Sequence, residues 1–291
     1  MTISIDNAYI QTFENNVRHL AQQGETKLRG TVQERSVSSE KHNWEIIGTL
    51  DASEKASARV ATPTQDAAWT RRVSLAKTYH IGTSTEQEDP IQMLVDPNSN
   101  LTRAISMGMK RQFDDVIIAA ATGTALLGDG TTSAFPAEQK VGDGTGEISF
   151  DMITEVQERF MAKDIDPSVP KIAVVGPKQV RKLMKLTEQT SSDYVTSQAL
   201  QQLNATGIVP NWMGFTWILS TRLLAPSANE LSCLFYTADA LGLQVNKDIT
   251  VRVAEDPSLS FAWRLYAHMT LGAVRVEDEQ IVHAHVADTV A

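Results

Sequence analysis

The strongest constraint on the fold is one long amphipathic segment, "DPNSNLTRAISMGMKRQFDDVIIAAATG", at residues 96–123. Asp96 is suited to cap a helix with Pro97 in its first position, and Gly123 is suited to end it in a left-handed conformation. Between these ends apolar residues recur every three or four positions, at Leu101, Ile105, Met109, Phe113, Val116 and Ala120. Such a helix is about 40 Å long, so the domain that contains it must be built along it.

Two shorter helices are predicted in the middle of the chain. Ser149 is suited to cap the first, and the turn "DIDPSVP" ends it. The buried strand "KIAVV" leads into the second, "GPKQVRKLMKLTEQ", which has Pro177 in its first turn. The predicted buried sides are Ile153, Val156, Phe160 and Met161 in the first helix and Val180, Leu183, Met184 and Thr187 in the second. The adjoining face of the second helix carries a basic stripe, Lys178, Arg181, Lys182 and Lys185.

The last third of the sequence is rich in strand patterns. "GFTWILS", "LSCLFYT", "GLQVN" and "ITVRVAED" read as short strands, and "SFAWRLYAHMTLGAVRVEDEQIVHAHV" reads as a longer strand region. One side of this longer region is predicted to be half-buried and consists of Phe261, Trp263, Leu265, Ala267, Met269 and Leu271. Helices and strands are largely segregated along the chain, which indicates an α+β fold.

A polar stretch, "DASEKASARVATPTQDAAWTRRVSLAKTY" from Asp51 to Tyr79, has two extended arms around a polar middle. From Trp69 to Ile81 the residues alternate with the period of a strand, but arginine or lysine occurs on both faces. This favours one arm of a projecting hairpin, with Pro63 near its turn. Residues 51–68 offer few apolar side chains to offset the entropy of ordering the backbone, so we expect contacts from outside the subunit to hold them.

The first 45 residues are predicted to form an arm. A narrow apolar stripe of a short helix comes first, at Ile10, Phe13, Val17 and Leu20. The following "GETKLRGTVQERSVSSEKHNWEIIG" has few core residues and several β-formers. Such a segment suits a strand or arm that lies over another surface.

Composition excludes several classes of protein. A chain of 291 residues that is 42% hydrophobic can bury a sizeable core, in about two domains. The net charge of −9 argues against a sequence-independent nucleic-acid binder. No apolar run is long enough to span a membrane, and the first residues lack the features of a signal peptide, so we expect a soluble protein made in a cytosol. The single cysteine, Cys233, lies among apolar residues and is interpreted as a buried structural thiol.

No catalytic motif stands out. "IAVVGP" has one glycine where a dinucleotide-binding loop needs three, and "LLGDGTTS" and "VGDGTGE" fit tight turns better than the ligand spacing of a calcium loop. His283 and His285 lie two apart on a predicted strand, but without a third ligand nearby they favour a solvated pair over a zinc site. We therefore expect no enzyme, no cofactor and no metal, while a dispersed active site stays open.

The order of these segments resembles the major capsid proteins of tailed bacteriophages over nearly the whole chain. Its most specific parts are the long helix with its "TGTA" end and the closing segment from "DALGLQVN" to "LGAVRVEDEQIVHAHV", with "KIAVVGPKQVRKLMK" between them in the order. The resemblance implies the α+β capsid fold that these proteins share with encapsulin shells and the herpesvirus capsid floor. The expected parts are an N-terminal arm (1–45), an extended loop (46–84), a peripheral domain with the long helix as its spine (85–150), a mainly axial domain (151–255) and C-terminal strands returning to the peripheral domain (256–291).

The resemblance also implies a function. We expect a structural protein that self-assembles, as hexamers and pentamers, into an icosahedral shell around double-stranded DNA. The extended loop is expected to contact a neighbouring subunit through Glu54, Lys55, Arg59, Asp66, Trp69, Arg71 and Arg72. The basic stripe is expected to face the shell interior or an acidic neighbour, with a solvated face as the alternative.

The expected partners follow from the same resemblance. They are further copies of the chain, a portal, a scaffolding protein, and packaged DNA through weak non-specific contacts. A scaffolding protein is expected because the chain begins directly at the arm. A decoration protein stays open, and no membrane is involved. The expected location is the virion, and the host cytoplasm during assembly. Two alternative hypotheses remain: an encapsulin-like cellular compartment with the same fold, and a soluble α+β enzyme with a pocket of convergent polar groups.

Overall fold

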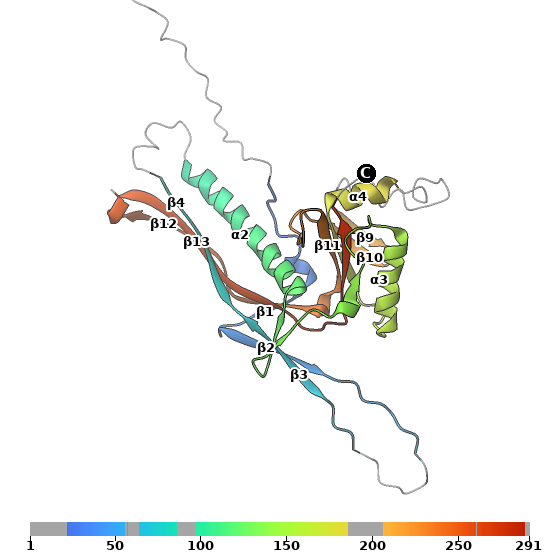
Figure 1. Cartoon of the computed structure of the whole chain (residues 1–291). Coiled ribbons are helices and arrows are strands. Elements are labelled where there is room, and N and C mark those ends of the chain that lie inside the picture. Colours follow the sequence, from blue (N-terminus) through green and yellow to red (C-terminus); the bar gives the residue numbers. More distant parts are fainter. Residues whose placement is uncertain are drawn as a thin grey trace, which may run out of the picture. The chain divides into compact units, whose positions relative to one another are not determined.

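The computed structural model describes residues 22–55, 57, 64–85, 97–185, 206–259 and 261–288 (Figure 1). The chain divides into two compact units: unit 1 consists of Met1–Glu25, Thr78–Arg111 and Asp248–Met269, and unit 2 of Thr26–Lys77, Gln112–Lys247 and Thr270–Ala291. The predicted stripe between Ile10 and Leu20, the turn residue Pro63 and the cap Asp96 lie outside the described residues. None of the helices within the described ranges is both long and apolar enough to span a membrane.

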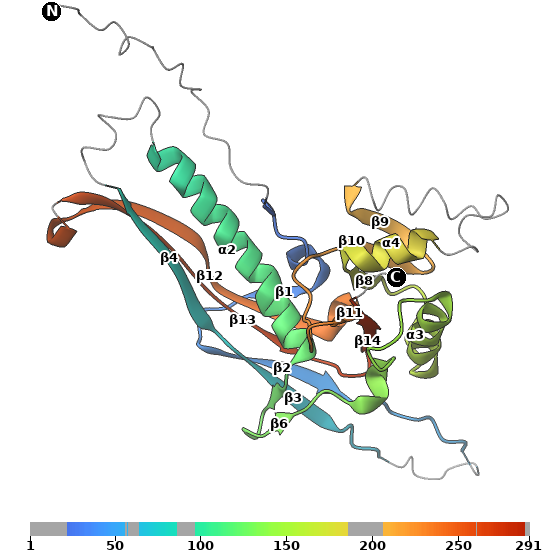
Figure 2. The ribbon, with the colours of Figure 1, turned by 45° about the horizontal axis from the view of Figure 1, so that its top comes forward.

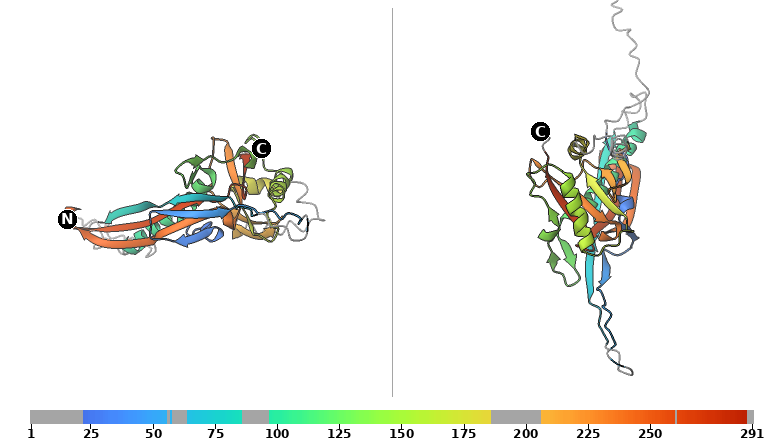
Figure 3. Two further views of the ribbon diagram at one scale, coloured as in Figure 1. Left: turned by 90° about the horizontal axis from the view of Figure 1, so that it is seen from below. Right: turned by 90° about the vertical axis from the view of Figure 1, so that its right-hand side faces the viewer.

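The longest strands belong to a four-stranded sheet with the order β1-β12-β13-β4. These strands are β1 (Gln33–Ser36), β12 (Leu241–Asp256), β13 (Ala262–Arg275) and β4 (Lys77–Thr85), the last three of which lie side by side in Figure 3. Strand β1 runs parallel to β12 opposite residues 242–245. The predicted alternation on β13 is confirmed at Leu265, Ala267, Met269 and Leu271, all of which are buried.

Helix α2 (Pro97–Thr122) confirms the predicted spine helix. In unit 1, Ile105 and Met109 are buried as predicted. The helix also approaches β4 closely, because a Cβ atom on Gly108 would lie 2.9 Å from the side chain of Ile81. The apolar face predicted from the periodicity of this segment therefore packs against the sheet.

In unit 2, a buried carboxylate attaches the chain ahead of β1 to α2. Asp114 is completely buried, and its side chain accepts hydrogen bonds of 3.1 Å from the backbone N–H groups of Lys27 and Leu28. A carboxylate in this position satisfies backbone donors that would otherwise be buried without a partner. Residues 26–28 are thus part of the subunit core, and Leu28 is itself fully buried.

Two details of the spine helix differ from the prediction. Beyond Phe113 the buried apolar residues are Ile117, Ile118 and Ala121, whereas Val116 and Ala120 are only half-buried. Steps of three and of four both suit a helix, and the packing selects between them. Gly123 does not adopt the left-handed conformation. Its N–H donates to Ala119 O, and a Cβ atom there would lie 2.7 Å from that oxygen, so the glycine permits close approach instead.

A six-stranded sheet with the order β7-β14-β11-β8-β10-β9 forms the core of unit 2. Its strands are β7 (Lys140–Val141), β14 (Ile281–Ala287), β11 (Glu230–Thr237), β8 (Lys171–Val175), β10 (Phe215–Leu219) and β9 (Ile208–Trp212). Helices α3 (Phe150–Ala162) and α4 (Pro177–Lys185) accompany it (Figure 2). Phe160 of α3 packs near Phe215, which contacts Trp217 and Phe235. The predicted Ser149 cap is confirmed, because its hydroxyl accepts a hydrogen bond from Met152 N.

Several predictions for this region need correction. Met161 is 66% exposed because it lies on the outer side of α3, and Phe261 is 56% exposed because it precedes β13 with a positive φ of 60°. The segments "GLQVN" and "ITVRVAED" form the single strand β12. Strand β9 was not predicted, and Thr187 lies outside the described residues.

The third sheet has the order β2-β3-β5-β6 and belongs to unit 2. It consists of β2 (Lys41–Ile47), β3 (Trp69–Leu75), β5 (Ala125–Leu127) and β6 (Thr132–Ser133). Within the described residues, the short 3-10 helices are η2 (Arg29–Thr31), η3 (Ala137–Gln139), η4 (Ala238–Ala240) and η5 (Pro257–Leu259). Because β5 begins two residues after Gly123, this sheet joins the end of α2 to the strands β2 and β3.

Candidate subunit interface

Strands β2 and β3 form an antiparallel hairpin, which extends in Figure 1 away from the six-stranded sheet of the same unit. The register runs from Lys41 opposite Leu75 to Ile47 opposite Trp69, and Gly48 N donates to Ala68 O just beyond. The hairpin predicted from the mixed polarity of the strand after Trp69 is therefore confirmed for residues 69–75. The predicted continuation of this strand to Ile81 is wrong, because the strand breaks at Ala76 and the chain enters a different sheet as β4. Its register places odd-numbered residues of β3 on one face and even-numbered residues on the other.

The far end of this hairpin exposes large apolar side chains. Ile47 is 57% exposed, Trp69 opposite it is 65% exposed, and Leu50 in the following segment is 60% exposed. Paired apolar side chains left open to water at the end of a projecting hairpin are typical of a surface that binds another protein. Sequence reasoning selected Trp69 and missed Ile47 and Leu50, although the run "WEIIGTL" breaks the polar alternation at this point.

A groove of about 510 Å³ lies beside the exposed pair. It is lined by Glu45, Trp69, Thr70, Arg71, Leu127, Gly128 and Asp129. Arg71 pairs with Glu45 at 2.5 Å, and its aliphatic stem lies where a Cβ atom on Gly128 would come within about 3 Å of it. The groove therefore combines an aromatic wall with charges of both signs, which suits specific contact with a protein surface.

The other predicted loop residues fall into three groups. Glu54, Lys55 and Asp66 are exposed, whereas Arg59 lies outside the described residues. Arg72 points to the opposite face of the hairpin, where its side chain is only 12% exposed and binds Asp278 at 2.8 Å. Arg72 therefore belongs to the interior of its own subunit, because the alternation of β3 turns it inward.

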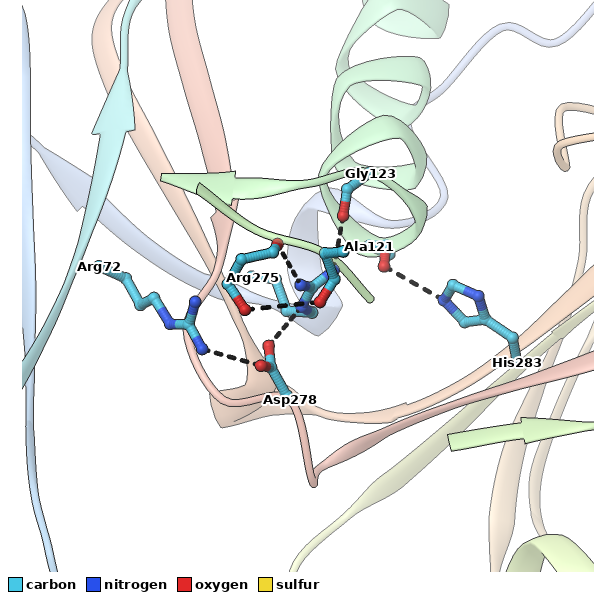
Figure 4. Close-up of polar contacts among 8 residues, drawn as sticks. Arg72, Ala121, Gly123, Arg275, Asp278 and His283 are labelled. Atoms are coloured by element: carbon cyan, nitrogen blue, oxygen red, sulfur yellow. Dashed lines mark hydrogen bonds and ion pairs between the residues drawn. The ribbon is translucent and has the colours of Figure 1, made fainter. Parts of the chain in front are cut away.

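Asp278 lies between two arginines, Arg72 and Arg275 (Figure 4). The fully buried Arg275 donates to Asp278 Oδ1 at 2.5 Å, to Gly123 O at 2.6 Å and to Ser133 O at 3.1 Å. Its guanidinium also lies 5.0 Å from the centre of the Phe135 ring. Three hydrogen-bond acceptors and a ring face thus compensate the burial of this charge.

His283 also contacts Phe135. The two rings stack at 3.7 Å, and His283 Nε2 lies 3.1 Å from Ala121 O. Burial lowers the pKa of His283 to about 3, so the ring is neutral at pH 7 and donates to that carbonyl. The predicted solvated pair is wrong for His283, because the core covers it. The buried thiol predicted for Cys233 is confirmed, and burial raises its pKa to about 12.

The two glycine-aspartate motifs form turns, as predicted. Asp129 accepts hydrogen bonds from the backbone N–H and the hydroxyl of Thr131, and these bonds lower the pKa of its carboxyl group. Asp143 and Thr145 repeat the arrangement. Within the described part of the chain, no group of three or more histidine, cysteine, aspartate or glutamate side chains is arranged to hold a metal ion.

Basic residues in the stripe of α4 form ion pairs within their own subunit. Lys178 binds Asp288 at 2.6 Å, and Lys182 forms an ion pair with Glu147. Arg181 and Lys185 are exposed. Carboxylates from two other segments therefore offset the charges of Lys178 and Lys182.

Several solved structures with this fold come from phage capsids. The chain is similar to the capsid of Ralstonia phage GP4 (TM-score 0.75, 9% identity, covering 100% of this chain and 98% of that chain). It is also similar to the capsid of Cyanophage P-SCSP1u (0.74, 12%, 99% and 96%) and to a structure from Mycobacterium phage Che8 (0.72, 16%, 97% and 98%). These likenesses show the fold of a phage capsid protein. No curated protein sequence matches the chain.

The family is shown by the sequence as well. A model of the family described as phage capsid protein matches residues 5–287, so the chain belongs to the phage capsid protein family. It is a structural protein that forms the shell of a phage particle, which confirms the resemblance drawn from the order of its segments. A cellular compartment shell and a soluble enzyme are not favoured by these matches.

Proposed function

We propose that residues 46–84, the extended loop, are the main contact through which one copy of this capsid protein binds the next in an icosahedral shell around double-stranded DNA. The observation that carries the proposal is the exposed pair of Ile47 and Trp69 at the end of the β2–β3 hairpin. Burying both side chains in a neighbour would remove a large apolar surface from water. Glu54, Lys55 and Asp66 would then fix the register of the contact by charge pairing.

The same proposal includes the parts and partners of the shell. The chain would contribute an arm (1–45), the extended loop, a peripheral domain (85–150), a mainly axial domain (151–255) and returning C-terminal strands (256–291) to hexamers and pentamers. Assembly in the host cytoplasm with a scaffolding protein and a portal precedes packaging, and the role is structural, without catalysis. The acidic net charge of −9 supports weak contact with the packaged DNA, with exposed Arg181 as the stripe's remaining point of attachment.

Serine at both positions of the exposed pair tests the interface. The double variant Ile47→Ser with Trp69→Ser is expected to lose about 3 kcal/mol of association free energy per contact, and subunits should remain dissociated in electron micrographs and sedimentation runs. Its thermal unfolding should match that of the parent chain, because neither side chain is part of the core.

The matched control is Met161→Ser, which removes an equally exposed apolar side chain from α3. This variant is expected to assemble normally. Shells of normal yield from the double variant would refute the proposed interface, and equal failure of both variants would show that any exposed apolar residue matters.

A further inference from the structure

Asp278 is shared by two arginines from different elements (Figure 4). Arg72 of β3 donates to Asp278 Oδ2 at 2.8 Å, and Arg275 at the end of β13 donates to Oδ1 at 2.5 Å. All three side chains are less than one-fifth exposed, so water screens their charges weakly. The carboxylate therefore joins the inward face of the extended loop to the arginine that binds Gly123 O at the end of α2.

The backbone repeats this connection. Arg72 and Val73 of β3 pair with Leu127 and Leu126 of β5, which follows the spine helix directly. Gly128 N also donates to Arg71 O. The base of the hairpin and the carboxyl end of α2 are thus linked both by strand pairing and through Asp278.

A second buried polar cluster holds the same face of the hairpin. Trp44 Nε1 donates to Ser74 Oγ at 3.1 Å, and that hydroxyl donates to Gln244 Oε1 at 2.7 Å. The Trp44 ring lies over Gly242, where a Cβ atom would come within 2.5 Å of it. Beyond Gly48 and Ala68, the described residues 49–55, 57 and 64–68 belong to no strand. The pairing thus ends where the exposed apolar residues begin.

We propose that Asp278 is a positioning residue that sets the direction of the extended loop from the end of the spine helix before any neighbour is bound. Adjustment to different neighbours is then left to residues beyond the last strand pair, such as 48–55 and 64–68. The purpose of this positioning rests on the proposed role of the loop as a subunit contact. Its test does not, because the direction of the hairpin is a property of the free subunit.

Distances between spin labels in dissociated subunits test the proposal. One label replaces Glu158, which is exposed on α3. The other replaces either Thr70, near the start of β3, or Asp66, which precedes that strand. The native Cys233 is fully buried and does not react with the labels. The parent chain is expected to give a narrow distance distribution for the 70–158 pair and a broad one for the 66–158 pair.

Arg72→Gln breaks one side of the shared carboxylate and leaves the pair of Asp278 with Arg275. We expect the 70–158 distribution to broaden, with the circular dichroism spectrum unchanged. It should stay narrower than that of the 66–158 pair, because the strand pairing and the Trp44–Ser74–Gln244 cluster are retained. Asp278→Asn should give the same broadening if this variant folds. It leaves the buried Arg275 with a neutral partner, which can prevent folding. In that case Arg72→Gln decides the test.

Glu279→Gln is the matched control, because it removes a neighbouring carboxylate that binds Lys163 on the surface. It is expected to keep the narrow peak. A narrow 70–158 distribution in Arg72→Gln, or equal broadening in Glu279→Gln, would overturn the assignment of Asp278. Neither result bears on assembly, so the failure of this proposal and the failure of the proposed interface are separate outcomes.

Discussion

Replacing Gly272 with alanine is expected to lower the free energy of unfolding of the subunit by about 4 kcal/mol. Gly272 lies on β13, next to the point where β3 ends and β4 begins. A Cβ atom on Gly272 would lie 2.1 Å from Leu75 O and 3.1 Å from Ala76 N. Both neighbours are backbone atoms, one in β3 and one at the junction of β3 with β4, so they cannot yield as a flexible side chain would. Chemical denaturation of dissociated subunits measures the loss directly.

Gly30→Ala is the matched control, because no atom lies within 4 Å of the position that its Cβ would take. Its free energy of unfolding should stay within about 0.5 kcal/mol of the parent value, as for most surface substitutions. A Gly272→Ala subunit as stable as Gly30→Ala would mean that β13 and the β3–β4 junction do not approach as the structure describes.

Acidification is expected to destabilise the subunit through His283. Burial holds its folded-state pKa at about 3, below the ordinary value of 6.5. As the pH falls through 6.5, His283 therefore becomes protonated in the unfolded state but stays neutral in the folded state. The contribution of His283 to the free energy of unfolding is lost progressively toward pH 3. Between pH 7 and pH 4 this single group is expected to lower the free energy of unfolding by about 3 kcal/mol.

His283→Phe separates this effect from the titration of other groups. The phenyl ring can still stack on Phe135, but it does not titrate and cannot donate to Ala121 O. The variant should be less stable than the parent at pH 7 by about 1 kcal/mol. It should become the more stable of the two near pH 4. Stability curves that stay parallel between these pH values would contradict a buried neutral histidine.

Local signals in the sequence predicted much of the fold. The apolar period between Pro97 and Gly123 gave the spine helix, and Ser149 gave the start of α3, because each depends on residues close in the chain. The predictions that Met161 of α3 is buried and that Val116 and Ala120 lie on the buried face of α2 were wrong. Both depend on which of two neighbouring helix faces meets a sheet, and a helical period alone does not select between them.

The candidate interface was predicted in part. The hairpin and Trp69 followed from a strand with charges on both faces, which a core does not accept. The inward turn of Arg72 and the burial of His283 were missed, because their partners Asp278 and Ala121 are 206 and 162 positions away. Contacts at that separation appear only once the sheets have formed.

Protection of the extended loop in dissociated subunits and in intact shells tests the central claim most directly. In subunits verified as monomers, residues 51–68 are expected to exchange their amide hydrogens rapidly and to be cleaved after Lys55 or Arg59, because few apolar side chains there offset the entropy of ordering. In shells the same residues should be protected, while α2 stays protected in both samples. Equal protection of the loop in the monomer and in the shell would mean that it folds onto its own subunit, which would contradict its role as the subunit contact.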